Sequence, residues 1–91
     1  MNSDELLRLR AEIDALDEKL LSVLAARFEV TTRVGKLKAQ NGIAAVDPSR
    51  EAELERMVRA RAGKLDLNPD FAWKVFRLVI DETVENHKRA R

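Results

Sequence analysis

The chain of 91 residues carries 17 Lys and Arg against 16 Asp and Glu, a formal net charge of +1, and no cysteine. Its length predicts one domain, spanning residues 1–91, near the size at which a single hydrophobic core is marginal. The balanced charge disfavours a sequence-independent nucleic-acid partner, and the absence of cysteine excludes disulfides and thiolate metal sites. Oligomerisation is the remaining common source of stability.

The N-terminal segment Met1-Asn2-Ser3-Asp4-Glu5 is acidic, and no apolar run follows it. No stretch of the chain approaches ~18 consecutive apolar residues, the length that a membrane span needs. These features predict neither a signal peptide nor a membrane segment, so we expect a cytoplasmic protein without a membrane partner.

The first predicted helix begins at a Ser3 cap and runs to about Lys38, before Asn41-Gly42 stops it. Ten of its positions follow one another at spacings of three and four, and nine of them are aliphatic. They are Leu6, Leu9, Ile13, Leu16, Leu20, Val23, Arg27, Val30, Val34 and Leu37. This apolar stripe is typical of a helix that packs along another helix. Gly35 interrupts good helix formers, and we interpret it as a site of close helix approach.

Arg27 is the one charged residue of the apolar stripe. A buried guanidinium needs an anionic partner, because it cannot lose its proton and an unpaired buried charge costs several kcal/mol. No Asp or Glu lies on the stripe, so the partner is either another segment or a bound anion. The alternative is a packed stem whose charged head reaches water.

Two shorter helices follow, and the same two-residue signal opens each of them. Asp47-Pro48 and Asn68-Pro69 each provide a capping side chain and then a first-turn proline. We expect the second helix to end at Gly63 and the third to continue to the basic residues 88–91. No strand pattern or repeat occurs, so the predicted fold class is all-α, with one long and two shorter helices.

The length of the first helix predicts a homodimer. A helix from residue 4 to about residue 40 is ~55 Å long, whereas a compact chain of this size has a radius of gyration of ~12 Å. Two shorter helices cannot cover the whole apolar stripe. We therefore expect a second copy to pack along it, with the long helices antiparallel, rather than a parallel coiled coil.

Polar side chains are predicted to point inward from all three helices. Arg27 and Lys38 lie ~16 Å apart on nearly the same side of the first helix, so both can reach one small anion. The inward polar positions of the other helices are Asp47, Arg50, Glu51, Thr83 and His87. Taken singly, Asp47 is explained as a cap, Glu51 as a solvated acid and His87 as a helix-end residue. Their alignment with Arg27 favours a binding site.

Arg10 flanks the apolar stripe but lies ~25 Å from Arg27 and ~42 Å from Lys38 along one helix. Within one chain it cannot reach an anion that those two residues hold. In an antiparallel dimer, the start of one long helix lies against the later part of its partner. Arg10 of one chain can then enter the site of the other.

Four segments of the chain resemble the all-helical chorismate mutase family. They are Leu9-Arg10-Ala11-Glu12-Ile13-Asp14-Ala15-Leu16-Asp17, Leu24-Ala25-Ala26-Arg27, Val34-Gly35-Lys36-Leu37-Lys38 and Asp47-Pro48-Ser49-Arg50-Glu51. The resemblance covers nearly the whole chain and includes charged residues at irregular spacing. It implies an intertwined homodimer of three-helix chains, two sites to which both chains contribute, and no cofactor or metal.

The resemblance also implies roles for the cationic residues. Arg10 of the partner chain, Arg27 and Lys38 would bind the two carboxylates of chorismate. Lys38 would also reach the ether oxygen. His87 stands where the best-known members carry a glutamine or glutamate that donates to this oxygen, and its imidazole can donate the same hydrogen bond.

The remaining candidates would contact other parts of the same substrate. By resemblance, Asp47 and Glu51 would approach the ring hydroxyl, and Arg50 and Thr83 would line the pocket. Rearrangement of chorismate to prephenate, a step of phenylalanine and tyrosine biosynthesis, needs a folded dianion and a stabilised ether oxygen but no nucleophile. Arginine clamps and fixed positive charge suit that chemistry.

Two other functions are compatible with the sequence. An isochorismate pyruvate lyase shares the fold and most of the cationic clamp, but Glu51 favours the mutase because it suits a hydroxyl contact. A non-catalytic helical dimer with a regulatory or scaffold role would pair Arg27 with a protein carboxylate instead of a substrate.

Overall fold

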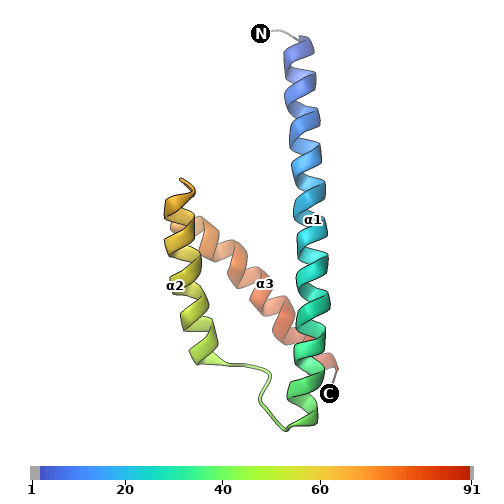
Figure 1. The fold of residues 1–91 in the computed structure, drawn as a ribbon, viewed down its shortest axis with the longest axis vertical. Coiled ribbons are helices and arrows are strands. Elements are labelled where there is room, and N and C mark those ends of the chain that lie inside the picture. The colour runs from blue at the N-terminus through green and yellow to red at the C-terminus, as the bar shows by residue number, and fades with distance from the viewer. Residues whose placement is uncertain (1–2, 91) are drawn as a thin grey trace. The chain divides into compact units, whose positions relative to one another are not determined.

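The structure, a computed structural model, describes residues 3–90 of the chain (Figure 1). It contains three helices, α1 (Ser3–Gln40), α2 (Pro48–Lys64) and α3 (Pro69–Arg89). No strand occurs among the described residues, so the prediction of an all-α fold with three helices is confirmed. The chain divides into two compact units, and the boundary lies within α1. The first unit ends at Thr31 and the second begins at Thr32.

The first unit consists of α1 up to Thr31. Asp4 and Glu5 lie in the first turn, where carboxylates complement the positive end of the helix dipole. The helix begins at Ser3 itself, one residue earlier than a Ser3 cap predicts. Most of the apolar stripe here is about half exposed or more, as at Leu9, Ile13, Leu16, Leu20, Val23 and Val30. Of the helices described, none is both long and apolar enough to cross a membrane.

The second unit contains the end of α1 together with α2 and α3, and its core lies between α2 and α3. Val58 and Ala62 of α2 are buried with Ala72 of α3. The two alanines allow the backbones to approach closely, and larger side chains surround them. These partly buried neighbours are Leu54, Trp73 and Phe76.

Both predicted helix starts in the second unit are confirmed. The Asp47 side chain accepts a hydrogen bond from the Arg50 N–H, and that of Asn68 accepts from the N–H groups of Asp70 and Phe71. Each cap satisfies backbone donors that the first helical turn leaves without intrahelical partners. The prolines occupy the first helical position, where no backbone donor is needed.

The predicted end of α2 at Gly63 is wrong. The helix continues to Lys64, and Leu65 caps it by donating its N–H to the last turn. The left-handed conformation that follows the helix belongs to Asp66, with φ 58°, instead of to a glycine. Asp tolerates this conformation better than most residues.

The end of α1 follows the prediction closely. The helix stops at Gln40, and Gly42 has φ 66° in the turn that follows. The Ile43 N–H donates to the Lys38 carbonyl at 2.8 Å, which closes the last turn. Glycine fits this position because it has no Cβ to clash with the backbone.

Candidate functional site

The start of α2 carries three of the candidate residues. Asp47 Oδ1 accepts a hydrogen bond from the Arg50 N–H at 3.1 Å, and the Asp47 carbonyl accepts one from the Glu51 N–H at 3.0 Å. With Pro48 at the first helical position, these bonds fix the backbone of the first turn. The cap and the proline therefore position the side chains of Arg50 and Glu51.

Arg50 is exposed, although its position in the sequence predicts that it points inward. Its Nη1 donates to Glu53 Oε1 at 2.6 Å, and the two side chains are 58% and 53% exposed. The acid one turn along α2 holds the guanidinium at the solvent-facing surface. Exposed pairs of this kind contribute only about 0–1 kcal/mol, so a ligand carboxylate can replace Glu53 easily.

Glu51 is paired across the two helices with Arg77 of α3. Arg77 Nη2 donates to Glu51 Oε1 at 2.5 Å, and the Glu51 side chain is 21% exposed. Arg77 Nε also donates to Asp81 Oδ1 at 3.0 Å, and the guanidinium lies 6.0 Å from the centre of the Trp73 ring. The hydrogen bond with Glu51 raises the pKa of Arg77 above its usual value. Glu51 is therefore held in place and is not a freely solvated acid.

Thr83 and His87 lie one turn apart on α3. Thr83 Oγ1 donates to the Val79 carbonyl at 2.9 Å, within the same helix. His87 is 4% exposed, and among residues 3–90 it is the one buried polar side chain. Ile80 lies seven residues before His87, on the same face of α3, and is buried as well. His87 thus lies on the buried side of α3, and Thr83 is partly buried.

Gly35 of α1 makes room for the His87 ring. A Cβ built on Gly35 would lie 2.5 Å from His87 Cδ2 and 3.0 Å from Nε2. Carbon atoms in contact are normally about 3.5–4.0 Å apart, so no larger residue fits without displacement of the ring. The interpretation of Gly35 as a site of close helix approach is thus confirmed, and the approaching group is a candidate catalytic side chain.

Lys38 lies in the last turn of α1 and is partly buried. Its backbone carbonyl accepts hydrogen bonds from the N–H groups of Asn41 and Ile43, at 3.2 and 2.8 Å. A cation in this position is favoured by the negative end of the helix dipole. The turn after α1 therefore fixes the backbone from which Lys38 extends.

Arg10 and Arg27 belong to the first unit, and the other six candidates belong to the second. Arg10 is exposed, whereas Arg27 is partly buried. The structure thus shows how exposed each of these two arginines is. That the eight candidate residues surround one substrate stays a prediction.

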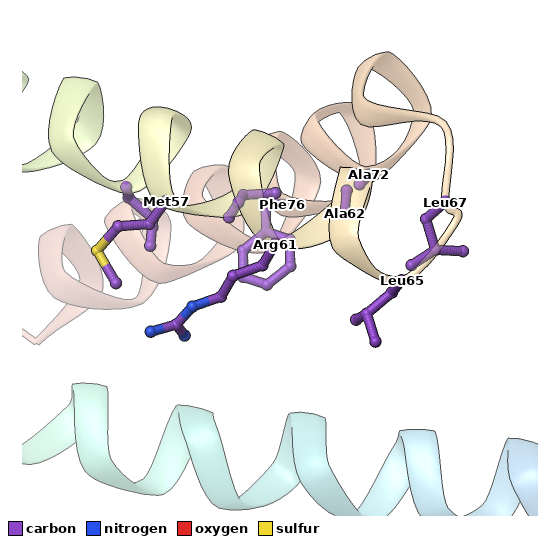
Figure 2. Close-up of a pocket in the computed structure, with 9 residues that line it drawn as sticks. Met57, Arg61, Ala62, Leu65, Leu67, Ala72 and Phe76 are labelled. Atoms are coloured by element: carbon purple, nitrogen blue, oxygen red, sulfur yellow. The ribbon is translucent and has the colours of Figure 1, made fainter.

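An apolar groove of about 260 Å³ lies along α2 and α3, where no sequence pattern indicates one. Figure 2 shows the side chains of Met57 and Phe76 reaching the same side of the helix pair, with Leu65 and Leu67 following from the loop. The complete lining is Leu54, Met57, Val58, Arg61, Ala62, Leu65, Leu67, Ala72 and Phe76. Part of the apolar surface of α2 and α3 is therefore not covered by other residues of the second unit.

Metal binding has no evident site in the part of the chain that the structure describes. Within residues 3–90, no group of three or more His, Asp or Glu side chains could hold a metal ion. Ion pairs that the structure describes include Arg50 with Glu53 within α2, and Arg59 with Asp70 and Arg77 with Glu51 between α2 and α3.

Arg77 is the main residue of the site region that sequence reasoning missed. Its partner Glu51 lies 26 positions earlier in the chain. The available signal was local, since Asp81 lies four residues after Arg77 and Trp73 four residues before it. This spacing predicts an i,i+4 ion pair but gives no indication of a partner on another helix.

Comparison with known proteins gives a match over most of the chain. The family model described as chorismate mutase type II matches residues 9–88. The T-protein of Enterobacter agglomerans is 40% identical over 86 residues, which are 92% of this chain but 23% of that protein. This chain therefore spans less than a quarter of the length of that relative.

Two further proteins match over most of their own length. The 4-amino-4-deoxychorismate mutase of Streptomyces venezuelae is 30% identical over 79 residues, 87% of this chain and 77% of that protein. Among solved structures, a conserved hypothetical protein from Pyrococcus furiosus has a TM-score of 0.72 and 28% sequence identity. That alignment covers 94% of this chain and 99% of the other.

Proposed function

Because the chain belongs to the chorismate mutase type II family, we propose that it catalyses the rearrangement of chorismate to prephenate in phenylalanine and tyrosine biosynthesis. The observation that carries this proposal is the family match over residues 9–88, which includes all eight candidate site residues. Those residues supply carboxylate clamps and a donor for an ether oxygen, as the reaction requires.

The reaction is pericyclic, so the protein has no covalent intermediate to form. Its task is to hold the side chain of the substrate over the ring and to stabilise the ether oxygen as the C–O bond breaks. Arg10 of a partner chain, Arg27 and Lys38 bind the two carboxylates. Bidentate arginine contacts orient a carboxylate more strictly than a single point charge, and orientation lowers the barrier of an intramolecular reaction.

Lys38 and His87 act at the ether oxygen, where negative charge develops in the transition state. The burial of His87 supports this role, because a donor in a water-poor setting interacts more strongly with developing charge than an exposed donor does. Contact with Gly35 restricts the imidazole, so the donor needs little reorganisation during the reaction.

The first turn of α2 binds the ring side of the substrate. Asp47 and Glu51 approach the ring hydroxyl, while Arg50 and Thr83 line the pocket. Arg50 exchanges its exposed pair with Glu53 for a substrate oxygen at little cost in free energy. The Thr83 hydroxyl donates to the Val79 carbonyl at 2.9 Å, which orients its side chain on α3.

The working protein is a homodimer in the cytoplasm, with sites shared between two chains. The exposed apolar stripe of α1 and the groove along α2 and α3 support this, because both leave apolar surface that a second copy can cover. Arg10 then reaches the site of the other chain from an antiparallel α1.

The test is to mix the purified chain with chorismate, follow the loss of chorismate absorbance and assay prephenate. We expect chorismate to disappear and prephenate to form in equal amounts. Release of pyruvate from isochorismate without prephenate formation would instead identify a lyase. No reaction with either compound would favour a non-catalytic helical dimer.

A further inference from the structure

The ion pair between Glu51 and Arg77 joins the proposed substrate site to a residue with no assigned role. It connects the first turn of α2 to the middle of α3, and the Glu51 side chain is 21% exposed. A hollow of about 240 Å³ adjoins the pair, and both side chains line it. The charged groups around this hollow are Glu51, Arg77, Asp81, Glu85 and Lys88.

Three contacts restrict the position of the Arg77 guanidinium. It donates to Glu51 at 2.5 Å, it donates to Asp81 at 3.0 Å, and it lies 6.0 Å from the centre of the Trp73 ring. Asp81 and Trp73 are one turn away on either side, so α3 itself orients the guanidinium. The guanidinium in turn sets where the Glu51 carboxylate lies.

We propose that Arg77 is a positioning residue for Glu51 and, through it, a determinant of the substituent that the protein accepts on the substrate ring. This inference rests on the proposed function, in which Glu51 approaches the ring hydroxyl. Arg77 offsets the negative charge of Glu51 and occupies one of its oxygens. A carboxylate in this state accepts a hydrogen bond from a neutral hydroxyl and gains little from an ammonium group.

Removal of the Arg77 charge therefore has a specific consequence. Without its partner, Glu51 is less firmly placed, and the hollow then holds the acids Glu51, Asp81 and Glu85 against the single cation Lys88. A substrate analogue with an ammonium group in place of the ring hydroxyl then gains relative to chorismate. A purely structural ion pair would change stability but would not change this preference.

The chain contains a matched control. Arg59 of α2 donates to Asp70 of α3 at 2.6 Å and to Glu55 at 2.8 Å, one turn earlier on its own helix. Arg59 and Arg77 are 37% and 40% exposed, and each joins α2 to α3 with a further acid four residues away. Arg59 lies outside the proposed site, so Arg59→Gln reports the effect of losing an interhelical ion pair alone.

The experiment compares kcat/KM for chorismate and for 4-amino-4-deoxychorismate in the purified homodimer. In Arg77→Gln we expect a lower value for chorismate and a rise of about fivefold in the amine-to-hydroxyl ratio. Arg59→Gln should leave the ratio unchanged. In a Glu51→Gln background, Arg77→Gln should produce no further change in the ratio, because the charge through which it acts is absent.

A second variant separates packing from charge. Arg77→Met keeps an apolar stem beside Trp73 and should shift the ratio as Arg77→Gln does. An unchanged ratio in either folded variant would overturn the inference, as would a shift that persists in the Glu51→Gln background. If the wild-type protein converts chorismate but Arg77 does not affect the ratio, only this inference fails. If it converts neither compound, the proposed function fails as well.

Discussion

Substitution of Gly35 by alanine tests whether the close contact with His87 matters for catalysis. The added Cβ would meet three atoms of the imidazole ring, at 2.5 Å from Cδ2, 3.0 Å from Nε2 and 3.1 Å from Cγ. The ring must therefore move by about 1 Å to restore ordinary contact distances. His87 is only 4% exposed, so this movement has to displace packed neighbours.

The effect on stability has two opposing contributions. Overpacking typically destabilises a protein by about 1–3 kcal/mol, while Gly→Ala in a helix stabilises it by up to about 1 kcal/mol. We expect Gly35→Ala to lower the free energy of unfolding by about 0–2 kcal/mol. Activity should fall further, by about 10²-fold, because a misplacement of about 1 Å affects a catalytic donor strongly.

Gly63→Ala is the matched control, since a Cβ at this helical position meets no atom within 4 Å. It should stabilise the protein by about 0.5–1 kcal/mol and leave prephenate formation unchanged. The measurements are urea unfolding by circular dichroism at one fixed protein concentration and initial rates with chorismate. Wild-type stability and wild-type rates in Gly35→Ala would show that the contact with His87 has no role in catalysis. A stability loss that persists in a His87→Ala background, where the clashing ring is absent, would show that this contact is not its cause.

Three further substitutions test individual side chains. His87→Gln retains an N–H donor and should keep much of the activity. His87→Leu has no donor and should lose about 10²-fold in kcat. Equal losses of kcat in the two variants would contradict a donor role for His87. Asp47→Ala should lower the free energy of unfolding by about 1 kcal/mol through loss of the helix cap, and Asp47→Asn should not, as urea unfolding can measure. The hydrogen bond from Arg59 lowers the pKa of Asp70 in the folded protein. The stability that this pair contributes is therefore present above the unfolded-state pKa of Asp70. It is lost as the pH falls through the lower folded-state pKa. The difference in Tm between wild type and Asp70→Asn should therefore shrink as the pH falls below about 4, the usual pKa of Asp, and a constant difference would contradict the assignment.

Sequence patterns predicted the parts of the fold that depend on neighbouring residues. Asp47-Pro48 and Asn68-Pro69 predicted the starts of α2 and α3, because a cap and a first-turn proline act within a few residues. Gly63 was a misleading stop signal for α2. The residue with left-handed backbone conformation after α2 is Asp66. The end of this helix therefore depends on the loop residues that follow it and not on the glycine alone.

The site was less predictable where it depends on packing between helices. Periodicity correctly placed His87 on the inner face of α3, and Gly35 was correctly interpreted as a close approach. That these two residues meet depends on how the end of α1 lies against α3, which no local pattern encodes. The pairing of Glu51 with Arg77 depends in the same way on the register of α2 against α3.

We propose that chorismate is rearranged at a site that combines Arg10 of one chain with Lys38 of another. Arg10→Ala and Lys38→Ala homodimers should each be nearly inactive. In a mixed dimer of the two variants, one site contains both substitutions and the other contains neither. Random assortment makes about half of the dimers mixed, so about a quarter of all sites should be intact.

The measurement is prephenate formation by co-expressed Arg10→Ala and Lys38→Ala chains, with the fraction of mixed dimers determined by mass spectrometry. When assortment is random, we expect the mixture to show about a quarter of the wild-type activity at equal protein concentration. Confirmed mixed dimers that form no more prephenate than the two inactive homodimers would contradict the shared site.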